Sequence, residues 1–276
     1  MTPGSGAGTG TGVERMETSM EYLLETREVT KRFGGLTAVD RVSVGVRPGE
    51  ALALLGDNGA GKSTLIKIIS GVYPPDGGEI LIEGKPARIA SPMDALAAGI
   101  ETIYQDLALA ENLDVGANIF LGRERLKRRL GVHVLDDAGM AAEAQKVLDR
   151  LDIHIPSLRS TIRTLSGGQR QAVAISRSIY WKAKVLIMDE PTAALGIAEQ
   201  RKVLNLVRTL KDQGLGIIII SHQMYDVFEV ADRLAVMRRG VKVGERLVKE
   251  TTPDEVVGLI VGSETVAARK ARVDGP

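Results

Sequence analysis

The chain of 276 residues contains no cysteine, which excludes disulfides and thiolate metal sites. It also lacks any apolar run that approaches the ~18 residues of a membrane span, so we expect a membrane link only through a partner. Charge of one sign is missing too, because 36 basic and 35 acidic residues leave a net charge of +1. No overall field therefore points to nucleic acid, and we expect none as a partner.

The chain ends are poor in apolar sequence. Residues 1–20 have neither an apolar core nor a basic start, which predicts a disordered tail and no signal peptide. Residues 263–276 are predicted to form a flexible basic tail. Between them, 44% hydrophobic and 26% charged residues overall suit one large domain, 21–262. From residue 106 the strand signals fade, and we expect a helical subdomain at about 106–175.

The strongest motif is a glycine-rich stretch between an apolar run of strand length, 51–55, and a predicted helix, 65–69. This stretch has the P-loop pattern G-x-x-x-x-G-K-[ST]. It consists of Gly56, Asp57, Asn58, Gly59, Ala60, Gly61, Lys62, Ser63 and Thr64. Glycines let backbone N–H groups curl around a phosphate chain, and a helix N-terminus adds its positive dipole end. Lys62 can reach the outer phosphates and the Ser63 hydroxyl can bind Mg²⁺. The alternative, a plain glycine turn, does not explain this context.

Short apolar runs and helical patterns alternate along the rest of the chain, which predicts a parallel sheet with helices on both faces. We expect a helix over 198–213 between strands 184–188 and 216–220. The predicted strands and helices outside this unit are 22–29, 39–46, 79–82, 92–98, 102–104, 139–151, 170–180, 233–237, 241–246 and 253–261.

Two acidic residues follow one of these strands directly. Ligands of open α/β sheets bind outside the carboxyl ends of the strands, so Asp189 is expected to help hold Mg²⁺. Glu190 can orient and polarise the attacking water. His222, just past another strand end, can hydrogen-bond a γ-phosphate. Solvated loop acids and a packed loop histidine are the alternatives, and the P-loop favours the catalytic interpretation.

A second glycine-rich stretch precedes a predicted helix and has no lysine of its own. It consists of Leu165, Ser166, Gly167, Gly168 and Gln169. As in the P-loop, glycines permit close backbone approach and a helix N-terminus attracts anions. The stretch is therefore predicted to be a second phosphate-recognising surface.

These five residues resemble the signature motif of ABC ATPases. In that family the signature lies between the Walker A motif, here the P-loop 56–64, and the Walker B motif, here the predicted strand that Asp189 follows. The resemblance covers about 23–262 and implies an α/β P-loop NTPase of ABC type. Such a fold has a mainly parallel sheet core, an antiparallel β subdomain and a helical subdomain. The resemblance further implies that Phe33 stacks on adenine, that Gln105 lies near Mg²⁺ and water, that Glu190 is the catalytic glutamate and that His222 is the switch histidine. It also implies ATP and Mg²⁺ as ligands, with each ATP held between one P-loop and the other subunit's signature in a head-to-tail homodimer.

Four further stretches are similar to single-domain ATP-binding subunits of bacterial importers of ribose or fructose type. They are 104–109, 118–123, 191–196 and 227–233. This resemblance implies a peripheral subunit at the cytoplasmic face of the membrane. Its partners would be permease subunits and, through them, a periplasmic or extracellular sugar-binding protein. The alternatives are a soluble ABC ATPase that acts on nucleic acid or the ribosome, and a nucleotide-dependent regulator.

One position departs from the family pattern. Many ABC ATPases have an aspartate at the end of the loop after Walker B, where this chain has Gly196, and Glu199 is a possible substitute.

The basic cluster 123–129 is expected to be a solvated face. The functional alternative is a surface near the permease or the anionic inner leaflet. Nucleic acid is the weakest interpretation because no aromatic residues interleave these charges.

Overall fold

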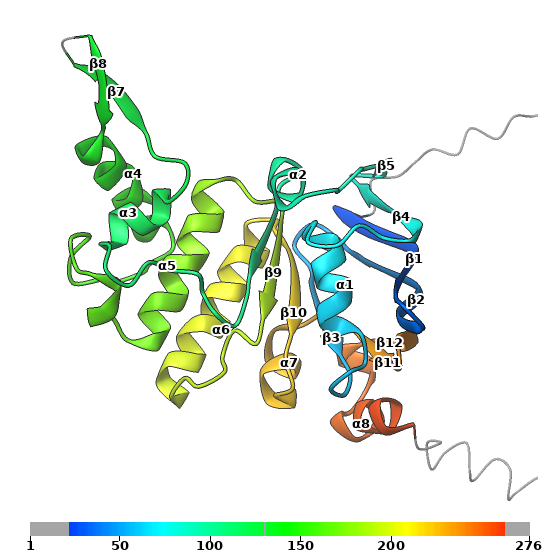
Figure 1. Cartoon of the computed structure of the whole chain (residues 1–276). Helices are drawn as coiled ribbons and strands as arrows, with labels where there is room; N and C mark the ends of the chain where they lie inside the picture. Colours follow the sequence, from blue (N-terminus) through cyan, green and yellow to red (C-terminus); the bar gives the residue numbers. More distant parts are fainter. Residues whose placement is uncertain (1–21, 130, 263–276) are drawn as a thin grey trace, which may run out of the picture.

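The computed structural model describes residues 22–129 and 131–262, so the predicted tails 1–20 and 263–276 lie outside the described residues (Figure 1). Within those ranges, no helix is long and apolar enough to cross a membrane.

A six-stranded sheet forms the centre of the molecule. Five strands run parallel, and β12 pairs antiparallel with β11 at one edge. The order is β12 (Val241–Leu247), β11 (Arg233–Arg238), β3 (Ala51–Leu55), β10 (Gly216–Ile220), β9 (Val185–Asp189) and β6 (Ile100–Ile103). The inner strands are short and mostly apolar, as expected for strands buried on both faces. The predicted parallel sheet is confirmed.

A second, antiparallel sheet lies beside the first, with α1 (Lys62–Ile69) between them in Figure 1. Its order is β2 (Leu36–Val46), β1 (Leu24–Phe33), β4 (Gly77–Ile82) and β5 (Lys85–Pro86). The predicted strands 22–29 and 39–46 end too early at this turn, because pairing continues to Phe33 opposite Leu36. Only Gly34 and Gly35 turn, because Gly34 takes a φ of +57° that other residues rarely adopt.

Helices on the other side of the central sheet complete its core. The long helices α5 (Gly167–Tyr180) and α6 (Ile197–Asp212) bury apolar side chains against β9 and β10. The remaining helical elements around the two sheets are α2 (Pro92–Ala97), α7 (Met224–Val230), the 3₁₀ turn Val248–Glu250 and α8 (Pro253–Val261). The prediction for α6 is one residue late at each end, and that for α8 is correct.

A helical lobe projects from this body and has its own apolar cluster around Phe120. It contains α3 (Val115–Phe120), α4 (Asp137–Arg150), the 3₁₀ turn Ile162–Thr164 and the start of α5. The limits 106 and 175 stay a prediction, because α5 runs on to Tyr180 and contributes to two clusters. The sequence did not indicate a β-hairpin in this lobe: the charged stretch 123–129, expected to be a solvated face, contains its first strand. The strands of the hairpin are β7 (Leu126–Arg129) and β8 (Val132–Leu135).

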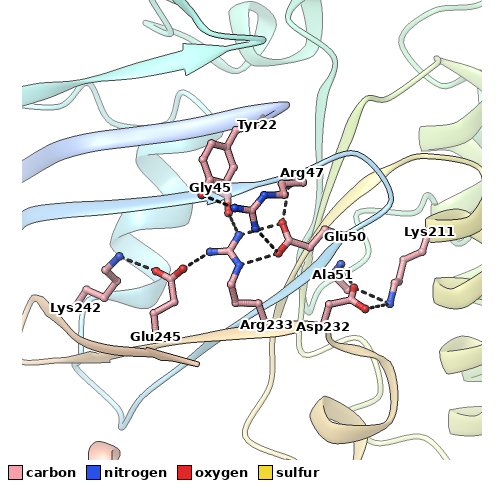
Figure 2. Close-up of polar contacts among 10 residues, drawn as sticks. All are labelled: Tyr22, Gly45, Arg47, Glu50, Ala51, Lys211, Asp232, Arg233, Lys242 and Glu245. Atoms are coloured by element: carbon pink, nitrogen blue, oxygen red, sulfur yellow. Dashed lines mark hydrogen bonds and ion pairs between the residues drawn. The ribbon is translucent and has the colours of Figure 1, made fainter. Parts of the chain in front are cut away.

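A buried ionic network joins the two sheets at the amino end of β3, opposite the end that leads into the P-loop (Figure 2). The Arg233 guanidinium donates to both carboxylate oxygens of Glu50, at 2.7 and 3.0 Å, and to the Gly45 carbonyl of β2. It also donates to Glu245 on β12. Because a buried pair that loses one partner costs about 3–5 kcal/mol, this network fixes the angle between the sheets. It therefore stabilises the position of β3, the strand whose carboxyl end leads into the P-loop.

Candidate functional site

The P-loop connects buried strand β3 to α1 through a backbone that only glycine accepts at two points. Gly56 has a φ of +148°, and a Cβ there would lie 2.2 Å from the Met237 carbonyl. Gly61 has a φ of +100°, and its Cβ would lie 2.4 Å from the Ala38 carbonyl. No side chain caps α1, so the N–H groups of its first turn remain available to a ligand.

Lys62 lies folded over this loop. Its Nζ donates to the carbonyls of Gly56 at 2.7 Å and Asp57 at 3.0 Å. Burial lowers the pKa of Lys62, although Glu190 and Asp189 oppose this by attraction. The ammonium is therefore poorly satisfied, and the phosphates of a ligand would satisfy it better than two neutral carbonyls.

The loop forms one wall of an open cavity of about 540 Å³. Its opposite wall comes from the β2 start and the β11–β12 turn, which the sequence did not indicate as site residues. The walls are Leu36, Thr37, Ala38, Asn58, Gly59, Ala60, Gly61, Lys62, Ser63, Thr64, Arg239 and Gly240. Gly240 joins the two walls, since its N–H donates to the Ala60 carbonyl at 3.0 Å and its carbonyl accepts from Asp40.

Phe33 is not among the residues that line this cavity. Its ring packs edge-on against Tyr73, with centroids 5.3 Å apart, and it is 42% exposed. Exposed Leu36 stands in the cavity wall instead. Stacking of Phe33 on adenine therefore stays a prediction.

The predicted acid–base residues come together at the carboxyl ends of β9 and β10. His222 Nδ1 lies 2.9 Å from Oε1 of Glu190. Glu190 adopts a left-handed φ of +51°, and its N–H donates to the Ile220 carbonyl at 2.8 Å. The other oxygen of Glu190 is buried without a hydrogen-bond partner among the described residues. A buried, unpartnered carboxylate oxygen has the properties of a proton acceptor for water.

Asp189 lies beside this pair. Burial and the adjacent Glu190 raise its pKa, while Lys62 pulls in the opposite direction. Mg²⁺ usually binds through one or two carboxylates plus substrate phosphates, so Asp189 with the Ser63 hydroxyl fits it. Among the described residues, no group of three acidic or histidine side chains offers an all-protein metal cage.

Gln105 lies elsewhere around the same carboxylate. It lines a second cavity, of about 320 Å³, between the helical lobe and the central sheet. Glu190 lines this cavity as well, whereas the P-loop residues do not. Gln105 and the Glu190 carboxylate thus border the same cavity, and the role of Gln105 with Mg²⁺ and water stays a prediction.

The sequence gave no indication of a buried contact behind the carboxylates. Thr192, two residues after Glu190, donates its hydroxyl to Asp226 in α7, and both residues are buried. Since α7 begins two residues after His222, this contact ties the loop of the glutamate to that of the histidine. Thr and Asp in loops are too common to be singled out before the fold brings them together.

The signature motif starts α5 with a complete capping box. The Ser166 hydroxyl accepts from the Gln169 N–H at 3.3 Å, and the Gln169 side chain accepts from the Ser166 N–H at 3.0 Å. A Cβ on Gly167 would lie 2.7 Å from the Leu195 side chain, and one on Gly168 would lie 3.1 Å from that of Glu199. No signature residue lines the P-loop cavity. Gly167 does line the second cavity together with Gln105 and Glu190, so within one chain the signature borders the acid–base residues but not the P-loop cavity.

Comparisons with known proteins agree with this geometry. Residues 39–193 match the family model described as ABC transporter. The xylose/arabinose import ATP-binding protein of Sulfolobus acidocaldarius is 51% identical over 241 residues, which are 87% of this chain and 94% of that protein. The fructose import ATP-binding protein of Rhizobium meliloti is 46% identical, over 89% of this chain and 96% of that protein.

Other relatives are longer or more distant. The ribose import ATP-binding protein of Rubrobacter xylanophilus is 46% identical over 88% of this chain, which spans 48% of that protein. A crystal structure of an ATP-binding cassette of an ABC transporter, in its ADP conformation, is 28% identical with a TM-score of 0.74. That match covers 88% of this chain and 99% of the solved one.

Proposed function

This chain belongs to the ABC transporter family, and we propose that it is the ATP-hydrolysing subunit of an importer that moves a small sugar through a membrane permease. One observation carries the proposal. Lys62 of the P-loop is attracted by Asp189 and Glu190, and His222 contacts Glu190, at the carboxyl ends of adjacent parallel strands. The import function rests on the sugar importers that share 46–51% identity over nearly their whole length.

Each residue has a distinct task in hydrolysis. The N–H groups of the loop and Lys62 bind the phosphate chain and stabilise the charge that develops on it. Ser63 and Asp189 would hold Mg²⁺, which would supply further charge neutralisation at the phosphates. Glu190 accepts a proton from the attacking water, and His222 holds Glu190 and the γ-phosphate in register. Thr192 and Asp226 fix the distance between these two loops.

The separation of the two phosphate-recognising surfaces supports pairing of two chains. In the proposed head-to-tail homodimer, each ATP contacts one P-loop and the partner's signature. The chain without ATP is expected to be largely monomeric. The dimer binds two permease subunits at the cytoplasmic face of the membrane. A sugar-binding protein on the far side delivers the solute.

The experiment is ATP hydrolysis by this chain reconstituted with its permease in proteoliposomes. Candidate pentoses and hexoses are supplied with the cognate binding protein. We expect turnover and sugar uptake to rise together with one sugar and to stop together in Glu190→Gln. Hydrolysis that does not respond to any permease or sugar would instead support a soluble ATPase or a regulator.

A further inference from the structure

The β7–β8 hairpin concentrates positive charge that the rest of the chain lacks. Residues 123–135 hold five basic residues and one acidic residue, a local charge of +4 in a chain whose net charge is +1. Figure 1 shows the hairpin as an arm beyond α3 and α4, at the opposite end of the molecule from α8. This arm, with the loop 123–125 that leads into it, is called the basic arm below.

The basic arm also exposes apolar side chains that a solvated hairpin does not need. Leu126 is 61% exposed, Val132 62% and Leu135 48%. The register pairs Leu126 with Leu135 and Arg128 with His133, so one face of the ribbon carries two leucines next to a basic pair. Apolar and basic side chains are therefore interleaved.

Few contacts within the chain use these charges. At the base, Arg123 stacks on Trp181 at 4.6 Å and lies 3.7 Å from Glu101. Lys127 pairs with Asp136 at 2.8 Å. Arg125 and Arg128 are exposed, and neither forms an ion pair with another described residue. Hydrogen-bonded lysines lower the pKa of Asp136 and Glu143 most, and Arg125 lies near enough to lower the pKa of both carboxyl groups further. An isolated two-stranded hairpin is only marginally stable in water, so a surface that binds both kinds of side chain would stabilise it.

We propose that the basic arm binds the anionic surface of the bilayer, with Arg125 and Arg128 on lipid phosphates and the apolar side chains at the acyl boundary. Interleaved apolar and basic residues suit such an interface, where long cationic side chains extend to the headgroups. A protein partner would favour an apolar face with charges at its rim. The inference rests on the proposed function, because a permease would hold the chain beside the membrane.

Binding of the full chain to vesicles tests the inference directly. Vesicles of phosphatidylcholine and phosphatidylglycerol in equal parts are compared with pure phosphatidylcholine by co-sedimentation. We expect binding only to the anionic vesicles, with a loss of about tenfold or more in Arg125→Glu/Arg128→Glu, since each basic side chain near such a surface contributes substantially. Leu126→Ser/Leu135→Ser, at the cross-strand leucine pair, should weaken the binding that survives at high salt, where charge attraction is screened.

The matched control is Arg246→Glu/Lys249→Glu, which makes the same charge change at exposed positions at the end of β12 and in the following turn. It should bind as the wild type does. Equal binding by the arm variants and the wild type would overturn the proposal. So would failure of the chain to bind anionic vesicles while the arm variants lose the permease in detergent, which would identify a protein partner. ATP hydrolysis in the same samples should be unchanged, and its absence in the wild type would count against the proposed function alone.

Discussion

The P-loop and the signature are both glycine-rich helix starts, yet the chain leaves the first unsatisfied and completes the second. At the P-loop, backbone groups are uncapped, Lys62 is folded onto neutral carbonyls, and a Glu190 oxygen is buried without a partner. At the signature, Ser166 and Gln169 cap each other. We infer that the P-loop needs a ligand to satisfy its polar groups, whereas the signature already has a fixed shape that it can present to a ligand.

The largest difference in nucleotide affinity is expected between two alanine variants, one at a glycine of the P-loop and one at a glycine of the signature. In Gly61→Ala the new Cβ meets the Ala38 carbonyl and the left-handed φ is strained, so we expect ATP binding to be lost. In Gly167→Ala the Cβ meets only the end of the Leu195 side chain, which can move. Nucleotide affinity by calorimetry, at concentrations where the chain is monomeric, should be unchanged in Gly167→Ala. Loss of affinity in both variants would mean that the signature binds ATP within one chain.

The next largest effect is expected at Glu190, whose carboxylate has one buried oxygen without a partner among the described residues. Glu190→Gln keeps the shape and removes the proton acceptor, so hydrolysis should fall by roughly 10²-fold or more. ATP binding should survive and pairing should persist, because chemistry and not recognition is blocked. Sedimentation with and without ATP measures the pairing, and the wild type under turnover is its control. Near-normal turnover would exclude Glu190 as the base.

The sequence predicted the P-loop side well because its chemistry is local. Gly56 to Thr64 follow one another along the chain, and Asp189 and Glu190 immediately follow a buried strand. The sequence indicated the basic cluster but not the hairpin that carries it, because four basic residues within 125–129 do not have the pattern of a strand. Its strand pairing comes only from Val132–Leu135 across the turn. Contacts such as Thr192 with Asp226, 34 residues apart, arise only from the fold.

Removal of the signature cap should have a moderate effect. Ser166→Ala loses the bond to the Gln169 N–H, and loss of such a cap costs about 1 kcal/mol of stability. We expect a slightly lower thermal midpoint, unchanged ATP affinity in the monomer, and loss of ATP-dependent pairing. Ser166→Thr keeps a hydroxyl and serves as the control. If pairing survives in Ser166→Ala, the hydroxyl contributes to the helix only.

The pH dependence of stability should reveal the raised pKa of Asp189 beside the P-loop. Because burial and Glu190 raise the pKa of Asp189, the folded chain binds this proton more tightly than the unfolded chain. Without nucleotide, the contribution of Asp189 to stability is therefore highest at acidic pH and falls as pH rises from its unfolded pKa, about 3.9, through its raised folded value. Asp189→Asn should make the thermal midpoint less dependent on pH over this range. Parallel slopes for Asp189→Asn and the wild type would contradict this.

The smallest expected effect is at Gly196, beside the signature. Gly196 is the N-cap of α6 without a side-chain bond, and a Cβ there would meet nothing within 4 Å. The possible substitute, Glu199, lies on Gly168, and hydrogen bonding from Ser166 lowers its pKa. Glu199 is thus engaged with the signature of its own chain. We therefore expect it not to replace an interfacial aspartate, and coupling between the two ATP sites to be weak.

Gly196→Asp should add a few tenths of a kcal/mol through the cap and place a charge at the proposed dimer interface. Coupling of two sites is typically ~1–3 kcal/mol, and one charge-assisted hydrogen bond is of comparable size. The Hill coefficient for ATP in the assembled transporter should therefore rise above that of the wild type. Gly196→Asn gives a similar cap without the charge, so it should raise stability but not cooperativity. A wild type that is already strongly cooperative, and does not respond to Gly196→Asp, would show that another contact sets the coupling.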